Sequence, residues 1–242
     1  MKNSIRVSEH FYSLQGEGNT MGIPAIFVRL QSCNLMCGGK GTEQDGKLHN
    51  GATWRCDTIE VWQKGIKYSV EDFADLIIKE YGEHILKGCH LVITGGEPLM
   101  QQRAVFDLIL DLIKKGYAPF IEIETNGTIL PSKEMGVVVN LWNVSPKLSN
   151  SGEILPKRYK PKVLEWYTKQ KAIFKFVISN YKDWEEVKEY GLPNEMMRLM
   201  PAASDIDELN KSSKLVSEIC INETIKFSSR LQIILWNKTT GV

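Results

Sequence analysis

The segment CHLVITGGEP, residues 89–98, decides the fold class of the chain. Its first half is a continuous apolar run, which is typical of a strand that is buried on both faces. The run then breaks into Gly95 and Gly96, two adjacent glycines that present backbone N–H and C=O groups to a ligand. Because strands buried on both faces occur in parallel sheets that helices cover, the segment predicts an α/β protein.

Strands and helices alternate outward from this segment. Apolar residues share one face of a predicted helix over 101–115, and Ser69 caps an earlier helix that Gly82 ends. Further strands are predicted over 24–30, 120–123, 137–144, 173–178, 196–200 and 230–236, and further helices over 161–170, 184–190 and 205–218. A strand followed by a helix, repeated about six times, implies parallel strands with right-handed crossovers. We therefore expect an incomplete (β/α)6 barrel, a partial TIM-like barrel that forms one domain over residues 1–242.

Polar and glycine-containing clusters follow the predicted strands. Residues 8–22 contain Gly16, Gly18 and Gly22, and they predict a loop that can approach a ligand closely. In parallel sheets and barrels, ligands bind at the carboxyl ends of the strands. We therefore expect one binding rim that several distant segments build together.

The composition of the 242 residues indicates which partners to expect. A formal net charge of +1 gives no bulk electrostatic attraction to nucleic acid or to a membrane surface. No apolar run approaches the roughly 20 residues of a membrane span, and the N-terminus lacks the apolar core of a signal sequence. We expect a cytoplasmic protein without nucleic-acid or membrane partners, whose five cysteines are thiols or metal ligands.

Three of the cysteines fall in one stretch. Cys33 and Cys37 follow the predicted strand 24–30, and a glycine-rich insertion at about 38–55 can fold out and return Cys56 to them. Three thiolates are one ligand short of a closed tetrahedral site, so they leave one position of a metal centre open for chemistry. A structural zinc site with His49 as the fourth ligand, or buried free cysteines, are the alternatives.

Several motifs together carry a resemblance to a known family. The chain contains FYSLQGEG at 11–18, CNLMC at 33–37, CDT at 56–58, TGGEP at 94–98, ETNG at 124–127, SPK at 145–147 and LW at 235–236. It resembles the radical S-adenosylmethionine superfamily and, within it, the 7-carboxy-7-deazaguanine synthase family of the queuosine and deazapurine pathway. The match covers nearly the whole chain, and the combination of SLQGEG with CDT is specific.

The resemblance implies a lyase that converts 6-carboxy-5,6,7,8-tetrahydropterin to 7-carboxy-7-deazaguanine with loss of ammonia. It implies a [4Fe–4S] cluster held by Cys33, Cys37 and Cys56, with S-adenosylmethionine on the fourth iron. No side chain is expected to be catalytic beyond the cofactor radical. Contacts to S-adenosylmethionine would come from Gly96, Ser145, Pro146, Lys147, Met200, Pro201, Ala202 and Ala203.

The resemblance also implies a substrate pocket and partners. Arg29 would pair with the substrate carboxylate, which suits its planar fork, and Thr58 would help to bind Mg²⁺. An electron donor such as flavodoxin and a homodimer are further expectations. Substrate contacts would come from Leu14, Gln15, Gly16, Arg29, Thr94 and Val242.

Three departures from the family pattern and two rival functions remain. Arg55 directly precedes the third cysteine, where the family often has an aromatic residue, and Trp54 stands one residue earlier. Eighteen residues separate Cys37 from Cys56, where the family usually has two, and Gln232 or Ile234 stands where many members have a histidine on the last strand. The rival within the superfamily is an activating enzyme that acts on a protein glycine. The rival from another class is a non-catalytic zinc-binding protein.

Overall fold

The computed structural model describes residues 3–39, 47–239 and 241. Within them, nine strands form one sheet in the order β3-β1-β2-β4-β5-β6-β7-β8-β9. The strands are β1 Ser4–Leu14, β2 Pro24–Leu30, β3 Ile66–Ser69, β4 His90–Gly95, β5 Phe120–Thr125, β6 Leu141–Val144, β7 Ala172–Ile178, β8 Met197–Pro201 and β9 Lys226–Phe227. The α-helices are α1 Ile59–Trp62, α2 Val70–Leu86, α3 Gln102–Lys114, α4 Lys133–Val138, α5 Leu155–Arg158, α6 Pro161–Thr168, α7 Tyr181–Glu189, α8 Ile206–Glu223 and α9 Leu231–Trp236. Short 3-10 turns lie at Gly18–Thr20, Pro98–Gln101, Ser149–Ser151 and Asn194–Met196.

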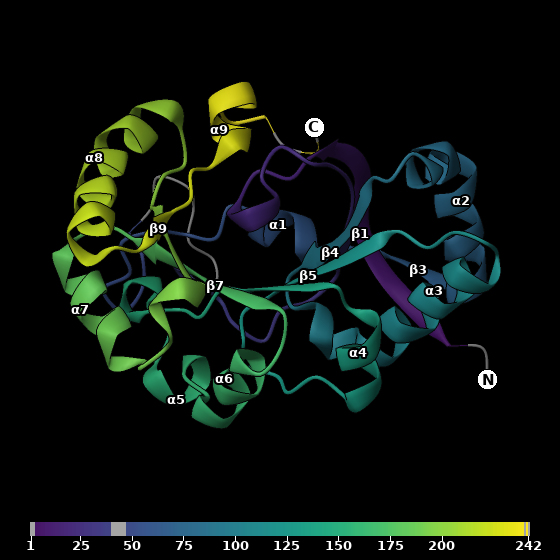
Figure 1. Cartoon of the computed structure of the whole chain (residues 1–242), viewed down its shortest axis with the longest axis horizontal. Coiled ribbons are helices and arrows are strands. Elements are labelled where there is room, and N and C mark those ends of the chain that lie inside the picture. The colour runs from purple at the N-terminus through teal and green to yellow at the C-terminus, as the bar shows by residue number, and fades with distance from the viewer. Residues whose placement is uncertain (1–2, 40–46, 240, 242) are drawn as a thin grey trace.

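The strands from β2 to β9 are parallel, as the alternating pattern predicts. β2 pairs with β4, and every later strand pairs in parallel with the one before it. β1 is antiparallel to both β2 and β3. Among the described residues the sheet is open, with β3 at one end and β9 at the other, and the longer helices lie around the outside of the strands (Figure 1). The α/β class is confirmed, whereas the barrel stays a prediction.

The two faces of the sheet differ in chemistry because side chains alternate along a strand. On one face, Ile26, Val28 and Leu30 of β2 belong to the large apolar core, which also holds buried residues of α2 and α3. The opposite face has only a small apolar cluster around Phe27 and Val92. We call it the polar face, and its members include Arg29, Thr94, Glu122, Glu124, Asn143 and Lys175.

Helix α2 confirms its predicted start but not its predicted end. Ser69 Oγ accepts a hydrogen bond from the Asp72 backbone N–H at 3.1 Å, the expected cap. The helix continues past Gly82 to Leu86. A side chain at Gly82 would place its Cβ 2.9 Å from Tyr117, so this glycine permits close packing and does not end the helix.

Three other predictions are wrong in part. Residues 8–14, predicted as part of a loop, belong to β1, whose residues 7–14 pair with β2. The predicted strand 137–144 is a strand only at Leu141–Val144, because Ser132 caps helix α4 just before it. Residues 230–236 are predicted as the last strand, but residues 231–236 form helix α9 instead. A short apolar run does not distinguish a strand from a helix, and the last strand is β9.

The elements β3 and α1 are not predicted at all. Both lie between the cysteine loop and α2, where short polar segments give little periodicity. Across residues 3–39, 47–239 and 241, none of the helices combines the length and apolar character that crossing a bilayer requires.

Candidate active site

The three cysteines of the loop after β2 come together as predicted. The Cys56 backbone N–H donates a hydrogen bond to the Cys37 carbonyl at 3.2 Å, so the chain returns to its starting point after the insertion. The Cys33 sulfur accepts a weak contact from the Leu35 N–H at 3.5 Å. All three cysteines are free thiols. The loop therefore gathers three sulfur donors beside the carboxyl end of β2.

Burial and mutual repulsion keep two of these thiols protonated. Burial raises the pKa of Cys33 to about 11, and the neighbouring Glu97 and Cys56 act in the same direction. Burial raises the pKa of Cys37 to about 12, with added repulsion from Cys56 and Cys33 and an opposing attraction from Lys147. A thiol of this kind ionises when a metal centre replaces its proton. The donor set therefore fits a metal group that binds soft sulfur.

A single zinc ion and an iron–sulfur cluster place different demands on three cysteines. Within the described ranges, no three or more His, Cys, Asp and Glu side chains group closely enough to hold one metal ion. A closed zinc site needs four ligand atoms at about 2.0–2.3 Å from one centre. In a cluster each thiolate binds a different iron, so its sulfurs lie further apart.

The ends of the insertion are anchored on the segment after β6. The Gly38 N–H donates to the Ser151 carbonyl at 2.9 Å, and the Thr53 N–H donates to the Asn150 carbonyl at 2.9 Å. The Trp54 indole Nε1 donates to the Asn150 side-chain oxygen at 2.9 Å. Residues 40–46 of the predicted insertion lie outside the described residues. The anchored ends therefore hold Cys56 next to Cys37.

The Gly-Gly-Glu turn after β4 packs directly against the cysteine loop. The Gly96 N–H donates to the Leu30 carbonyl at 3.2 Å. A Cβ on Gly96 would lie 2.0 Å from the Ser32 carbonyl oxygen, so only glycine fits at this approach. Glu97 is fully buried and accepts hydrogen bonds from the Asn126 N–H at 2.7 Å and from Thr125 Oγ1 at 2.9 Å. Burial raises the pKa of Glu97, and these donors oppose that rise. The same hydrogen bonds tie the end of β4 to the end of β5.

The other predicted cofactor residues follow β6 and lie at and after the end of β8. Lys147 Nζ donates to Ser145 Oγ at 2.9 Å and lies 5.6 Å above the Trp54 ring, while Pro146 between them is buried. Since Trp54 precedes Cys56 by two residues, this contact joins the SPK segment to the cysteine loop. The β8 segment comprises the buried Met200 and Pro201, and then Ala202 and Ala203. The Ala202 N–H donates to the Ile178 carbonyl at 3.0 Å, which fixes this segment beside the end of β7.

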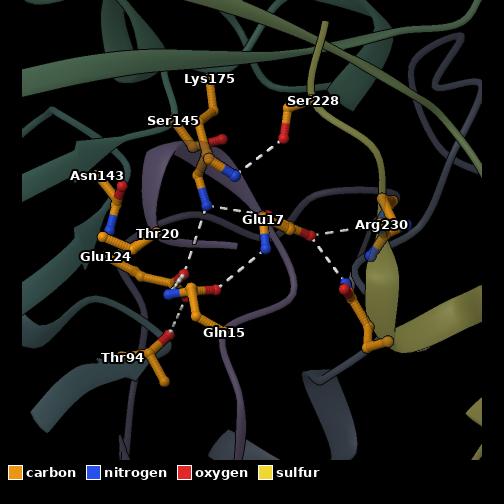
Figure 2. A network of polar contacts seen from close by, with 12 residues as sticks. Gln15, Glu17, Thr20, Thr94, Glu124, Asn143, Ser145, Lys175, Ser228 and Arg230 are labelled. Carbon is orange, nitrogen blue, oxygen red and sulfur yellow. Dashed lines mark hydrogen bonds and ion pairs between the residues drawn. The ribbon is translucent and has the colours of Figure 1, made fainter. Parts of the chain in front are cut away.

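A chain of polar side chains crosses the polar face (Figure 2). Thr94 Oγ1 donates to Glu124 Oε2 at 2.9 Å, and Lys175 Nζ lies 3.4 Å from Glu124 Oε1. Lys175 Nζ also donates to Glu17 Oε2 at 2.9 Å, and Arg230 Nε lies 3.3 Å from Glu17 Oε1. Four side chains of alternating charge thus lie in series, in the order Glu124, Lys175, Glu17 and Arg230.

The charges in this chain stabilise one another. Burial by itself would raise the pKa of Glu17, but the attraction of Lys175 and Arg230 outweighs it and lowers the pKa to about 2. Burial would likewise lower the pKa of Lys175, and the carboxylates of Glu124 and Glu17 raise it above its ordinary value. Both groups are therefore ionised at neutral pH.

The loop after β1 carries the predicted substrate residues. Leu14 ends β1, and the buried Gln15 places its Nε2 3.5 Å from Glu124 Oε1. The Gly16 carbonyl accepts a hydrogen bond from the Leu231 N–H at 2.9 Å. A Cβ on Gly16 would lie 2.0 Å from Gln232 Oε1, so the α9 segment closes over this loop. The loop therefore lies against both the polar face and the C-terminal segment.

Two further predicted site residues, Arg29 and Thr58, each contact a neighbouring side chain. Arg29 and Thr94 are neighbours in register on the polar face, and Arg29 Nε donates to Glu9 Oε1 at 2.7 Å. This ion pair uses one edge of a guanidinium that carries five N–H donors. Thr58 Oγ1 lies 3.4 Å from Cys56 Sγ, so the residue predicted for Mg²⁺ directly adjoins the cysteine site. Val242 lies outside the described residues.

The four charged residues of the polar chain, Glu124, Lys175, Glu17 and Arg230, were not predicted as site residues. Lys175 is the one that the sequence indicates most clearly. It lies inside the apolar run AIFKFVI, and a lysine in such a run is rarely buried unless an acidic side chain pairs with it. Glu124 stands in the ETNG motif and Glu17 in SLQGEG, yet neither motif shows which cation each meets. Those partners lie far away in sequence and required the fold.

Known proteins with the same architecture identify the family. No protein-family model matches the chain. The 7-carboxy-7-deazaguanine synthase of Escherichia coli K12 is 29% identical, over 92% of this chain and 94% of its own length. The crystal structure of QueE from Escherichia coli superposes with a TM-score of 0.63 and 27% identity, covering 94% of each chain. The 7-carboxy-7-deazaguanine synthase of Pyrobaculum aerophilum is 34% identical, over 98% of this chain and 97% of its own. With that identity over nearly the full length of both, the chain belongs to the 7-carboxy-7-deazaguanine synthase family.

Proposed function

We propose that the chain is a lyase that converts 6-carboxy-5,6,7,8-tetrahydropterin to 7-carboxy-7-deazaguanine with loss of ammonia, in 7-deazapurine biosynthesis. The single observation that carries this is the contact between the three-cysteine loop and the polar chain, which Arg230 makes by pairing with both Asp57 and Glu17. Family membership supplies the reaction, and the residues of this loop and of the polar chain supply the groups that it needs. A partial (β/α)6 barrel and a single domain form part of the proposal.

Cys33, Cys37 and Cys56 would hold a [4Fe–4S] cluster, with S-adenosylmethionine beside it. When bound, this pair supplies an organic radical that removes a hydrogen atom from the substrate. The residues of this chain bind the pair and keep water away from it. The remaining contacts to S-adenosylmethionine would come from Gly96, Ser145, Pro146, Lys147, Met200, Pro201, Ala202 and Ala203.

The polar face offers a planar heterocycle both donors and acceptors. Gln15 has an amide that donates and accepts, and Glu17 and Glu124 are acceptors beside the donor Lys175. Arg29 would bind the substrate carboxylate with the edge of its guanidinium away from Glu9, while Glu9 orients it. The backbone of Leu14 and Gly16, together with Thr94, would complete the pocket, and Val242 stays a predicted contact.

Thr58 would supply an oxygen ligand to Mg²⁺, a hard cation that prefers oxygen. Thr58 is the N-cap residue of helix α1, and its Oγ1 lies 3.4 Å from Cys56 Sγ. A flavodoxin-like electron donor, a homodimer and a cytoplasmic location complete the proposal.

The test is anaerobic incubation of the reconstituted protein with S-adenosylmethionine, reductant, Mg²⁺ and the carboxy-tetrahydropterin, followed by mass analysis. We expect a product that has lost ammonia and has the mass of 7-carboxy-7-deazaguanine. Cleavage of S-adenosylmethionine without any change in the pterin would favour the rival activating enzyme. A colourless preparation with stoichiometric zinc would overturn the radical mechanism altogether.

A further inference from the structure

One arginine lies where three binding segments meet. Arg230 stands between β9 and α9, and its guanidinium contacts groups from three separate parts of the chain. Nε lies 3.3 Å from Glu17 Oε1, Nη2 lies 3.0 Å from Asp57 Oδ2, and Nη1 donates to the Ala203 carbonyl. Each nitrogen of the fork thus serves a different segment.

The three acceptors belong to the three parts of the proposed site. Glu17 lies in the loop that is proposed to hold the pterin, and Figure 2 shows its carboxylate between Lys175 and Arg230. Asp57 lies between the cluster ligand Cys56 and Thr58. Ala203 lies in the segment after β8 that is proposed to contact S-adenosylmethionine. Arg230 is therefore a direct bridge between the two ligand sites and the cysteine loop.

Residues next to Arg230 also form hydrogen bonds with the loop after β1, which contains Glu17. Ser228 Oγ accepts from the Gly18 N–H at 2.9 Å, and the Leu231 N–H donates to the Gly16 carbonyl at 2.9 Å. Gln232 Nε2 donates to Glu17 Oε1 at 2.9 Å. A shift of residues 228–232 would therefore shift the whole loop and not one side chain.

The charge of Arg230 is well compensated in its location. Its side chain is 17% exposed, so its contacts are partly shielded from water. Burial acts to lower its pKa, and Asp57 and Glu17 more than offset this and raise the pKa. A planar fork with five donors can satisfy acceptors in three directions, which the single ammonium group of lysine cannot do.

We propose that Arg230 is a positioning residue that couples the two ligand sites, so that bound S-adenosylmethionine strengthens pterin binding and bound pterin strengthens S-adenosylmethionine binding. The inference rests on the proposed function, because it assigns ligands to the segments that Arg230 joins. Coupling of this kind is reciprocal, so each ligand raises the affinity of the other by the same factor. Arg230 touches neither reacting atom in the proposal and acts through Glu17, Asp57 and Ala203.

The test measures binding of S-adenosylmethionine to anaerobic holoenzyme by calorimetry, with and without the carboxy-tetrahydropterin. No reductant is present, so neither ligand is consumed. We expect the pterin to raise the affinity of the unaltered protein for S-adenosylmethionine at least ~5-fold, which is the lower end of the range for coupled sites. We call the affinity for S-adenosylmethionine with the pterin, divided by the affinity without it, the affinity ratio. In Arg230→Lys and Arg230→Gln we expect this ratio to fall to about 1, while each variant still binds S-adenosylmethionine alone.

A second readout uses the protein without its ligands. Amide hydrogen exchange at residues 15–18 should become faster in both Arg230 variants, because the loop loses an anchor. Arg103→Gln is the matched control: Arg103 is exposed on α3, where it pairs with Asp107, and this variant should keep both the ratio and the exchange rates.

The outcomes separate the inference from the proposed function. If the unaltered protein binds both ligands without coupling, or if Arg230→Lys keeps the full ratio, the inference is wrong and the proposed function stands. If the unaltered holoenzyme does not bind the pterin at all, the proposed function fails and the inference fails with it. If Arg230 only supported the structure, its replacement would weaken the binding of both ligands equally and leave the affinity ratio unchanged. That result would also overturn the inference.

Discussion

The ammonium group of Lys175 lies 2.9 Å from the carboxylate of Glu17, although the two are 158 positions apart in sequence. Lys175 projects from the middle of β7 and is 3% exposed, so its charge is held away from water. The pair connects the loop after β1 to the far half of the sheet. It also fixes the position of a carboxylate that is proposed to face the substrate.

Lys175→Met should destabilise the protein strongly. The substitution leaves the partly buried Glu17 and Glu124 without the cation between them, and removing one member of a buried pair costs about 3–5 kcal/mol. Urea unfolding of the protein without its cofactors would measure the loss. Lys182→Met on the exposed start of α7 is the control and should change stability by about 0.5 kcal/mol or less. Equal midpoints for the two variants would show that the buried pair adds nothing.

Acid should weaken the fold through Glu17. Its pKa is about 2 in the folded protein and 4.5 as the ordinary value, so the unfolded chain takes up the proton first as pH falls. The stability from this group is therefore full above pH 4.5 and is lost as pH falls toward 2, by about 3 kcal/mol in all. Urea unfolding between pH 6 and pH 3 should show a smaller loss in Glu17→Gln than in the unaltered protein. Identical pH dependence in both would contradict the low pKa.

Cys56→Ala should abolish cluster assembly. The variant removes one of three grouped sulfur donors, and the remaining two cannot hold the proposed centre. Iron content and the visible spectrum after anaerobic reconstitution would measure this. Cys89→Ala, a buried thiol at the start of β4, should still assemble the cluster. A normal cluster spectrum in Cys56→Ala would refute the ligand assignment.

Asn150→Ala should loosen the cysteine loop and leave the sheet intact. Asn150 accepts from Trp54 Nε1 at 2.9 Å and donates to the Val177 carbonyl at 2.9 Å, so it pins the insertion to β7. We expect amide exchange at residues 53–56 to become faster by about tenfold, the effect of about 1.4 kcal/mol. Asn210→Ala, on the exposed face of α8, provides a control in which that exchange should not change. No difference between the two variants would remove Asn150 from this role.

Arg29→Ala should reduce turnover without preventing reductive cleavage of S-adenosylmethionine. The guanidinium is proposed to hold the substrate carboxylate, and its loss costs a charge-assisted hydrogen bond of about 1.5–3 kcal/mol, roughly a tenfold to hundredfold change in kcat/KM. Anaerobic assays that follow both the pterin and 5′-deoxyadenosine would separate the two effects. Glu9→Gln keeps the arginine and should have a smaller effect. Normal turnover in Arg29→Ala would show that another group holds the carboxylate.

Much of the site follows from local sequence. Apolar runs that end in polar clusters predict parallel strands with one binding edge, and six of the seven parallel strands lie within the predicted ranges or overlap them. The insertion with Cys56 at its end predicts that the third cysteine returns to Cys33 and Cys37, which the backbone bond from Cys56 to Cys37 confirms. These features are predictable because hydrophobic period and turn residues act over short distances.

The sequence by itself determined the α/β class, the grouping of the cysteines and the edge of the sheet at which we propose that ligands bind. Only the tertiary structure decided that Lys175 meets Glu17, that Arg230 joins three segments, and that residues 231–236 form a helix and not a strand. Those outcomes depend on strand order and register, which bring together residues as many as 213 positions apart. A local pattern shows which side chains leave the apolar face, but the packing of the whole chain selects the partners they find there.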